Sequence, residues 1–378
     1  MKKSILNLLI AALIPVFSYS NEQTVRMYVG TYTGRGVDNG FYVIDVDLAN
    51  GIFTPVAEAD AGPSPSYFCI SQKRSIVYAI NEVNTFDGIS SLASVTALSL
   101  DVKSGATEKV KELAVPNGGP CYISIMPEED FLLVANYGGG SIAVVRLDGN
   151  GLPSEVTDTV VFREEGIRSA RGHMTATSPD GKKVYLSCLS LDKVMIFDLD
   201  KTTGKLTQTG YGSVPEGAGP RHFTFSKDGS KMFVINELGS TMTVFDIASD
   251  GGLREIQTIS TLPEDWTERN SCADVHLSKD GNYLYGSNRG HNSIVTYKVA
   301  ADGRLSLVGF TSSSINWPRN FTLDPSGKYL LVGNERTGEI ALFTIDGKTG
   351  LPIEPSINYA LPVSGEAVIR PACLKFIE

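Results

Sequence analysis

The chain has 378 residues, of which 42% are hydrophobic and 20% are charged, and its formal net charge is −9. This composition is typical of a globular protein with enough apolar side chains to form a core. The acidic balance and the lack of a basic run argue against nucleic acid as a partner.

Residues 1–20 have the pattern of a secretory signal peptide. Lys2 and Lys3 precede an apolar run of about 13 residues, which ends at Ser18-Tyr19-Ser20. The run is too short to span a bilayer comfortably, although a buried N-terminal helix is the alternative interpretation. We therefore expect cleavage after Ser20, a periplasmic or secreted protein without a membrane anchor, and a single domain over residues 21–378.

One pattern recurs seven times in the rest of the chain: a strand of aromatic and aliphatic residues that ends in a pair of consecutive residues, often Asn-Glu. The spacing is near 50 residues and no helical periodicity accompanies it, which is typical of four-stranded propeller blades. The pairs are Thr31-Tyr32, Asn81-Glu82, Asn136-Tyr137, Cys188-Leu189, Asn236-Glu237, Asn288-Arg289 and Asn334-Glu335.

The repeat around residue 236 shows the four strands of one blade. Alternation of apolar and polar residues predicts strands over 222–226, 232–236, 241–247 and 253–259, with turn residues at 227–230 and 249–252. At the ends of the chain, residues 371–377 resemble a first strand, and the segment from residue 25 supplies only strands two to four. The sequence therefore predicts an all-β, seven-bladed propeller whose last blade joins both ends of the chain.

Two sets of positions are expected at one mouth of the central channel, because the first strand of a blade begins where the second strand ends. Half of these positions are charged or histidine, whereas a packed channel favours small or apolar residues. This predicts a polar pocket in which arginines bind an anion and His and Glu transfer protons; the alternative is that Arg and Glu only neutralise each other. The two sets are Ser66, Cys121, His173, Arg221, Ala273, Arg319 and Ala372, and Tyr32, Glu82, Tyr137, Leu189, Glu237, Arg289 and Glu335.

Several motifs resemble those of the lactonase family of seven-bladed propellers, which includes 6-phosphogluconolactonases and carboxymuconate-lactonizing enzymes. The segments that carry the resemblance are residues 134–141 (VANYGGGS), 219–222 (GPRH), 236–238 (NEL), 287–294 (SNRGHNSI) and 317–319 (WPR). By this resemblance His173 matches the family's active-site histidine, Glu237 its catalytic glutamate, and Arg221 and Arg289 its substrate-binding arginines. Two departures lie near His173: Arg171 replaces the first His of a P-H-x-H motif, and Cys188-Leu189-Ser190 replaces an Asp-Leu-Gly element.

These observations predict a lactone hydrolase of the 6-phosphogluconolactonase type, with a small anionic lactone or sugar acid as its ligand. His173 and Glu237 are the expected catalytic residues, and either could be the base; the expected substrate-binding residues are Arg221, Arg289, His222, Arg319 and Glu335. The alternatives are a carboxymuconate-type cycloisomerase and an exported binding module for a sugar acid or a protein. The chain is expected to be a monomer.

No metal or other cofactor is expected. The five cysteines, at wide spacings and without a C-x-x-C pair, argue against a zinc site and are expected to be small buried residues.

Overall fold

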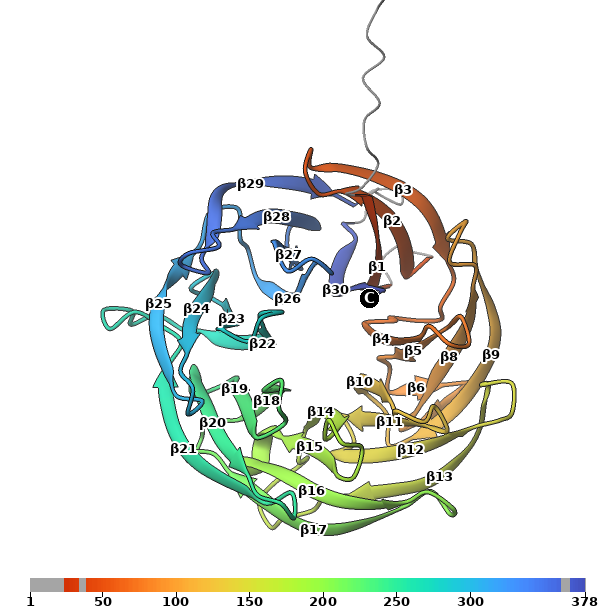
Figure 1. Cartoon of the computed structure of the whole chain (residues 1–378). Helices are drawn as coiled ribbons and strands as arrows, with labels where there is room; N and C mark the ends of the chain where they lie inside the picture. The colour runs from red at the N-terminus through yellow and green to blue at the C-terminus, as the bar shows by residue number, and fades with distance from the viewer. Residues whose placement is uncertain (1–23, 34–38, 362–367, 378) are drawn as a thin grey trace, which may run out of the picture.

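The computed structural model of the chain describes residues 24–33, 39–361 and 368–377. Seven four-stranded antiparallel sheets form a ring around a central channel, which confirms the predicted seven-bladed propeller (Figure 1). Within the described ranges the one helical element is a 3₁₀ turn, η1 (Leu189–Leu191), and no helix there is long and apolar enough to cross a membrane. The predicted signal peptide, residues 1–20, lies outside the described residues.

Each blade runs from an inner strand beside the channel to an outer strand on the rim. The inner strands are β4 (Tyr67–Ser71), β10 (Pro120–Ile125), β14 (Gly172–Thr177), β18 (Pro220–Phe225), β22 (Ser271–Leu277), β26 (Pro318–Leu323) and β30 (Arg370–Phe376). The second strands are β5 (Ile76–Asn81), β11 (Phe131–Asn136), β15 (Val184–Cys188), β19 (Lys231–Asn236), β23 (Tyr283–Arg289), β27 (Tyr329–Asn334) and β1 (Thr24–Tyr32).

The third strands, in the same blade order, are β8 (Leu92–Leu100), β12 (Ser141–Leu147), β16 (Lys193–Asp200), β20 (Thr241–Ile247), β24 (Ser293–Val299), β28 (Glu339–Ile345) and β2 (Phe41–Asp47). The outer strands are β9 (Thr107–Pro116), β13 (Pro153–Val161), β17 (Lys205–Ser213), β21 (Leu253–Ser260), β25 (Leu305–Thr311), β29 (Pro352–Ala360) and β3 (Ile52–Ala59). A short hairpin, β6 (Thr85–Phe86) and β7 (Ile89–Ser90), lies between β5 and β8.

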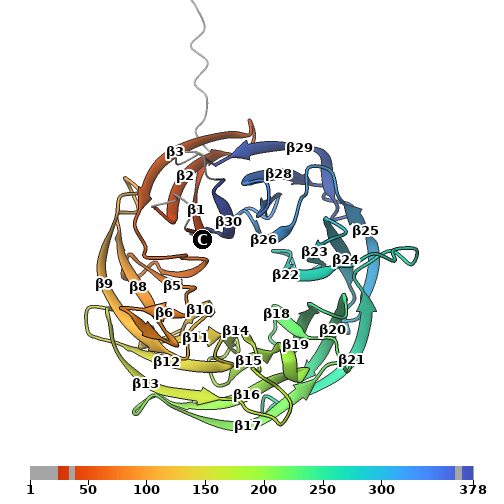
Figure 2. The same ribbon diagram turned by 180° about the vertical axis from the view of Figure 1, so that it is seen from behind.

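The ring closes through both ends of the chain. Strand β1 pairs antiparallel with β30 in a register that runs from Met27 opposite Phe376 to Tyr32 opposite Arg370, and both views show the pair completing the ring (Figure 2). This confirms the predicted pairing of the terminal segments. Closure matters because an open array of blades would leave unpaired strand edges.

Packing between blades explains why the second strands read as continuous apolar runs. Every residue of β5 and of β11 is buried, because the neighbouring blades cover both faces of these strands. The outer strands contain both partly buried and exposed residues, as in β21. All five cysteines are buried, as expected from the sequence, and all are free.

The asparagine that opens the repeated pair fastens its blade to the preceding segment. Asn81, Asn136, Asn236, Asn288 and Asn334 are fully buried at the ends of their second strands. In four of them the side-chain amide donates to a carbonyl of the segment that leaves the previous blade; these acceptors are Ala61, Pro116, Thr261 and Ser314. A buried amide needs such partners, so the repeated Asn is a structural link between blades.

Six of the seven inner strands carry a β-bulge where they begin. In each of them one extra residue is inserted relative to the second strand, at Cys121, Arg221, Arg319 and Ala372 and within residues 173–174 and 273–274. A bulge bends the strand and redirects its side chains, and bulges are frequent next to active sites. Here they sit at the mouth where the sequence placed the polar residues.

We predict that Asn288→Ala lowers the free energy of unfolding by about 1–3 kcal/mol. The substitution leaves the carbonyl of Thr261 without the amide that donates to it at 2.7 Å, and removes the acceptor of Thr261 Oγ1 at 3.0 Å. Urea denaturation measures the change. The control is Asn282→Ala in an exposed turn, expected to change stability by less than about 0.5 kcal/mol; equal losses in the two variants would contradict the structural role.

Candidate active site

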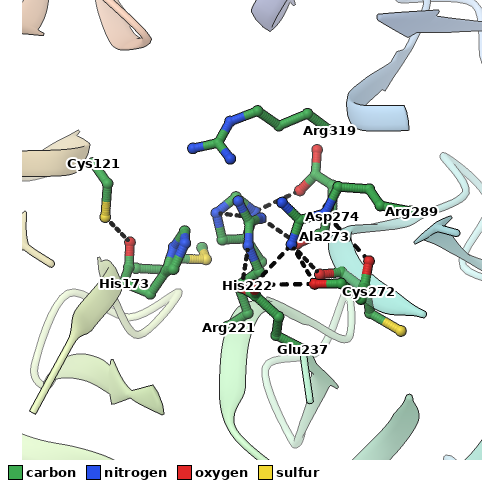
Figure 3. Close-up of polar contacts among 12 residues, drawn as sticks. Cys121, His173, Arg221, His222, Glu237, Cys272, Ala273, Asp274, Arg289 and Arg319 are labelled. Atoms are coloured by element: carbon green, nitrogen blue, oxygen red, sulfur yellow. Dashed lines mark hydrogen bonds and ion pairs between the residues drawn. The ribbon is translucent and has the colours of Figure 1, made fainter. Parts of the chain in front are cut away.

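Four of the predicted site residues meet at one mouth of the channel. His173 and Arg221 come from the inner strands β14 and β18, Glu237 follows β19, and Arg289 ends β23. Figure 3 shows Arg221, Glu237 and Arg289 grouped together, with His173 on the neighbouring blade and Arg319 above them. Because strand starts and strand ends alternate at this mouth, residues far apart in sequence become neighbours.

Glu237 lies between two buried arginines. Its Oε2 is 3.0 Å from Arg221 Nε and its Oε1 is 3.0 Å from Arg289 Nη2. The Arg221 and Arg289 side chains are 2% and 7% exposed, and that of Glu237 is 16% exposed. One carboxylate is therefore shared by two guanidinium groups that have little contact with bulk water.

Backbone carbonyls of β22 fix both guanidinium groups. Arg289 donates to the Ser271 carbonyl at 3.2 Å and to the Cys272 carbonyl at 2.9 Å, and Arg221 Nη1 donates to the Ala273 carbonyl. Strand β22 thus accepts hydrogen bonds from Arg289 of its own blade and from Arg221 of the neighbouring blade, and the positions of both arginines are set by backbone geometry as well as by Glu237.

The local field keeps Glu237 ionised. Burial opposes its ionisation, but Arg221, Arg289 and Arg319 outweigh this effect and lower the pKa of Glu237 below its usual value. Burial, reinforced by repulsion from Arg221, lowers the pKa of Arg289 to about 10. At neutral pH the site therefore holds an ionised carboxylate and charged arginines.

His173 is a buried, neutral imidazole. Burial and the positive charge of Arg221 hold its pKa well below the usual value. Its ring packs edge-on against Tyr137 and His222, at centroid distances of 5.6 and 5.1 Å, and its Nδ1 is buried without a hydrogen-bond partner among the described residues. A buried nitrogen of this kind is a candidate proton acceptor for a bound molecule.

Arg319 and Glu335 lie on the other side of the same mouth. Arg319 sits over the ring of Tyr32, with its Nη2 3.9 Å from Glu82 Oε2, and Tyr32 donates to that carboxylate at 2.9 Å. Glu335 is 3.6 Å from Arg370. Each carboxylate on this side therefore has a cationic neighbour, and Arg319 also contributes to the field at Glu237.

His222 points across the channel, below the mouth. Its ring is buried and packs edge-on against Tyr67 and Tyr122, which stack on each other with centroids 4.0 Å apart. Its Nδ1 lies 2.7 Å from Asp274 and its Nε2 lies 3.3 Å from Arg221. The expected role of His222 in binding substrate stays a prediction, and in this structure both of its nitrogens contact protein groups.

Asp274 and the pair Tyr67 and Tyr122 were not among the site residues predicted from the sequence. All three directly follow positions assigned to the mouth, namely Ala273, Ser66 and Cys121. A strict alternation of faces assigns such residues to the other side of the strand. For Asp274 and Tyr122 the bulge at the strand start breaks that alternation. The one sequence feature that could have indicated Asp274 is an Asp inside a predicted strand.

Three further arginines surround the mouth, each against an aromatic ring. The guanidinium carbon of Arg336 is 3.4 Å from the centroid of Trp317, that of Arg171 is 5.4 Å from Tyr137, and that of Arg370 is 5.1 Å from Tyr32. With Arg221, Arg289 and Arg319 they outnumber the glutamates 82, 237 and 335, although the whole chain is acidic. This local excess of positive charge favours an anionic ligand.

The opposite mouth has a cavity of its own, about 490 Å³ in volume, lined by Tyr67, His276, Lys279, Leu374 and Lys375 among others. Tyr67, which lines this cavity, also contacts His222. Across the described part of the chain, no group of three or more His, Cys, Asp or Glu side chains is placed to hold a metal ion.

Comparison with known proteins identifies relatives along almost the whole chain. Residues 26–366 match the family model described as lactonase, 7-bladed beta-propeller. A 6-phosphogluconolactonase of Bacillus subtilis is 30% identical over 361 residues, covering 93% of this chain and 97% of the relative. A 6-phosphogluconolactonase of an Enterobacter species is 32% identical over 271 residues, covering 71% of this chain and 78% of the relative.

Among solved structures, a periplasmic gluconolactonase of Pseudomonas aeruginosa superposes with a TM-score of 0.86 at 27% identity. The match covers 94% of this chain and 99% of that one.

We predict that Glu237→Gln strengthens the binding of inorganic phosphate at the mouth. The change removes a negative charge that competes for Arg221 and Arg289, and one such charge within several ångströms changes the binding free energy by about 1 kcal/mol or more. Isothermal titration calorimetry measures the dissociation constant, with Glu108→Gln on an outer strand as the control. Weaker phosphate binding by Glu237→Gln than by this control would contradict a site built for an anion.

Proposed function

This chain belongs to the lactonase family of seven-bladed β-propellers, and on that basis we propose that it is an exported hydrolase that opens a sugar-acid lactone at the arginine-rich mouth of its channel. The observation that carries the proposal is the neutral His173 at the same mouth as Glu237 and its two buried arginines. Lactone hydrolysis needs a proton acceptor for the attacking water and positive charge for the oxyanion.

The reaction begins with a water molecule held beside His173. The neutral imidazole accepts a proton from this water as the water oxygen attacks the lactone carbonyl carbon. The carbonyl oxygen becomes the oxyanion of a tetrahedral intermediate, which Arg221 stabilises. The ring C–O bond then breaks, the imidazolium returns the proton to the departing ring oxygen, and the product is a hydroxy acid that ionises at neutral pH.

Electrostatics favour His173 as the base over Glu237. The carboxylate of Glu237 is engaged by two arginines, and its lowered pKa makes it a weak proton acceptor. Burial and the charge of Arg221 disfavour an imidazolium at residue 173 in the free enzyme, but the oxyanion formed in the same step offsets the repulsion from Arg221. Glu237 then serves to hold Arg221 and Arg289 in place.

The proposed substrate class is the lactone of a sugar acid, bound through Arg289 and Arg319. Gluconolactone fits the name of the periplasmic structural neighbour, and 6-phosphogluconolactone fits the names of the curated relatives. We favour the unphosphorylated lactone, because the predicted signal peptide directs the chain out of the compartment where phosphorylated sugars are abundant. Periplasmic or secreted localisation is part of this proposal.

We predict that the protein releases acid from glucono-δ-lactone and that His173→Gln lowers kcat by about 10²–10⁴-fold, the usual contribution of a general base. A pH-stat measures the rate over a panel of δ-lactones, phosphorylated and unphosphorylated. His291→Gln is the control, because that ring lies half-buried against Trp266 and Phe310.

Because the pKa of His173 is lowered, we also expect kcat/KM to stay at its neutral-pH value below pH 6.5, where an ordinary imidazole base would be protonated. Absence of hydrolysis across the panel, together with tight gluconate binding, would favour a binding module; isomerisation of a muconate would favour the cycloisomerase.

A further inference from the structure

Three buried polar side chains, in contact one after another, extend inward from the site. Arg221 Nη1 lies 3.3 Å from His222 Nε2, and His222 Nδ1 lies 2.7 Å from Asp274 Oδ1. All three side chains are buried, with Arg221 and Asp274 each 2% exposed (Figure 3). Asp274 comes from the neighbouring blade, so these contacts cross an interface between blades.

The donors and acceptors fix the tautomer of His222. A guanidinium group has no acceptor, so the contact with Arg221 is attractive only if His222 Nε2 carries a lone pair. The proton of the neutral ring must then be on Nδ1, where it is donated to Asp274. This is the less common tautomer of a free imidazole, and the carboxylate of Asp274 is what selects it.

Asp274 is itself held by further donors. His276 Nε2 lies 3.0 Å from Oδ2, the backbone N–H of Val275 donates to Oδ1 at 3.0 Å, and Asn320 donates to Oδ2 from the next blade. A carboxylate with donors on both oxygens has a fixed orientation. The position of His222 Nε2, and with it the acceptor that faces Arg221, is fixed in turn.

We propose that Asp274 and His222 are positioning residues that hold the guanidinium of Arg221 in its catalytic orientation through the Nδ1–H tautomer of His222. The inference rests on the proposed lactonase function, in which Arg221 stabilises the oxyanion. Without the acceptor at His222 Nε2, Arg221 Nη1 retains the Ala273 carbonyl alone, and the guanidinium loses the contact that sets its rotation at that end.

The electrostatic setting supports a neutral His222. Burial and the charge of Arg221 lower its pKa to about 4, and Asp274 only partly opposes this. The groups that face the ring are Arg221, Asp274, His173, Tyr67 and Tyr122. Protonation of His222 would therefore remove the acceptor that faces Arg221 and place a second positive charge beside it.

The first test reads the tautomer directly. In protein with ¹⁵N- and ¹³C-labelled histidine, the ring nitrogen and carbon shifts of His222 at pH 6 distinguish the Nδ1–H form, the Nε2–H form and the imidazolium. His222→Asn identifies the resonances. We expect Nδ1–H in the wild type; an Nε2–H ring or an imidazolium in the wild type overturns the proposal.

The second test uses two substitutions of His222, one that keeps the contact with Arg221 and one that keeps the contact with Asp274. The amide of His222→Gln reaches the place of Nε2 and can accept from Arg221, whereas that of His222→Asn reaches the place of Nδ1 and can donate to Asp274. We expect kcat for glucono-δ-lactone to fall at least tenfold in His222→Asn and in Asp274→Asn, with KM changed less than threefold. His222→Gln should recover most of the loss.

A purely structural role gives a different result. Loss of packing alone would lower the melting temperature and the fraction of folded enzyme in His222→Asn and His222→Gln alike, while kcat per folded molecule stayed within twofold of wild type. That outcome overturns the proposal. If the wild-type protein hydrolyses no lactone, the proposed function fails by itself, and the tautomer measurement still decides the positioning of Arg221.

Discussion

The residue inserted at the start of the inner strands is the constraint on which the candidate site depends. In a regular strand successive side chains point to opposite faces, so Arg221 and His222 could not both be directed toward the channel. The bulge in β18 places Arg221 at the mouth beside Glu237 and His222 across the channel against Tyr67 and Tyr122. The same irregularity in five other blades gives the mouth its two layers of side chains.

The site also shows how buried charge is tolerated in this fold. Burying two guanidinium groups away from bulk water is unfavourable in free energy, and Glu237 with the carbonyls of β22 provides their partners. One carboxylate does not neutralise two arginines, and the remaining positive charge is available to a ligand. Glu82 and Glu335 balance the charges of Arg319 and Arg370 on the far side of the mouth.

Much of the architecture could be predicted from the sequence because the repeat has a physical basis. Largely buried second strands recur at a spacing near 50 residues, and five of them end in a buried Asn, so the blade count, the strands around residue 236 and the joining of the two ends were all predictable. The positions of His173, Arg221, Glu237 and Arg289 at one mouth followed from strand direction. Their chemical roles are not fixed by this placement.

Other parts of the site could not be predicted, because they depend on the bulges and on contacts across the channel. Nothing in the sequence near Asp274 indicates that it binds His222, since that contact joins residues 52 apart in different blades. For the same reason the sequence could not assign Tyr67 and Tyr122 to the channel. His222 was expected to bind substrate, and in this structure its ring packs against Tyr67 and Tyr122 across the channel.

The blade shared by β1 and β30 sets the order in which the molecule can be assembled. Its four strands come from the first and last parts of the ring, and more than 300 residues separate Tyr32 from Arg370. At ordinary rates of synthesis the ribosome needs on the order of tens of seconds to make that stretch. During this time the early blades have no closing partner, so the ring can close only after the last strand has been made.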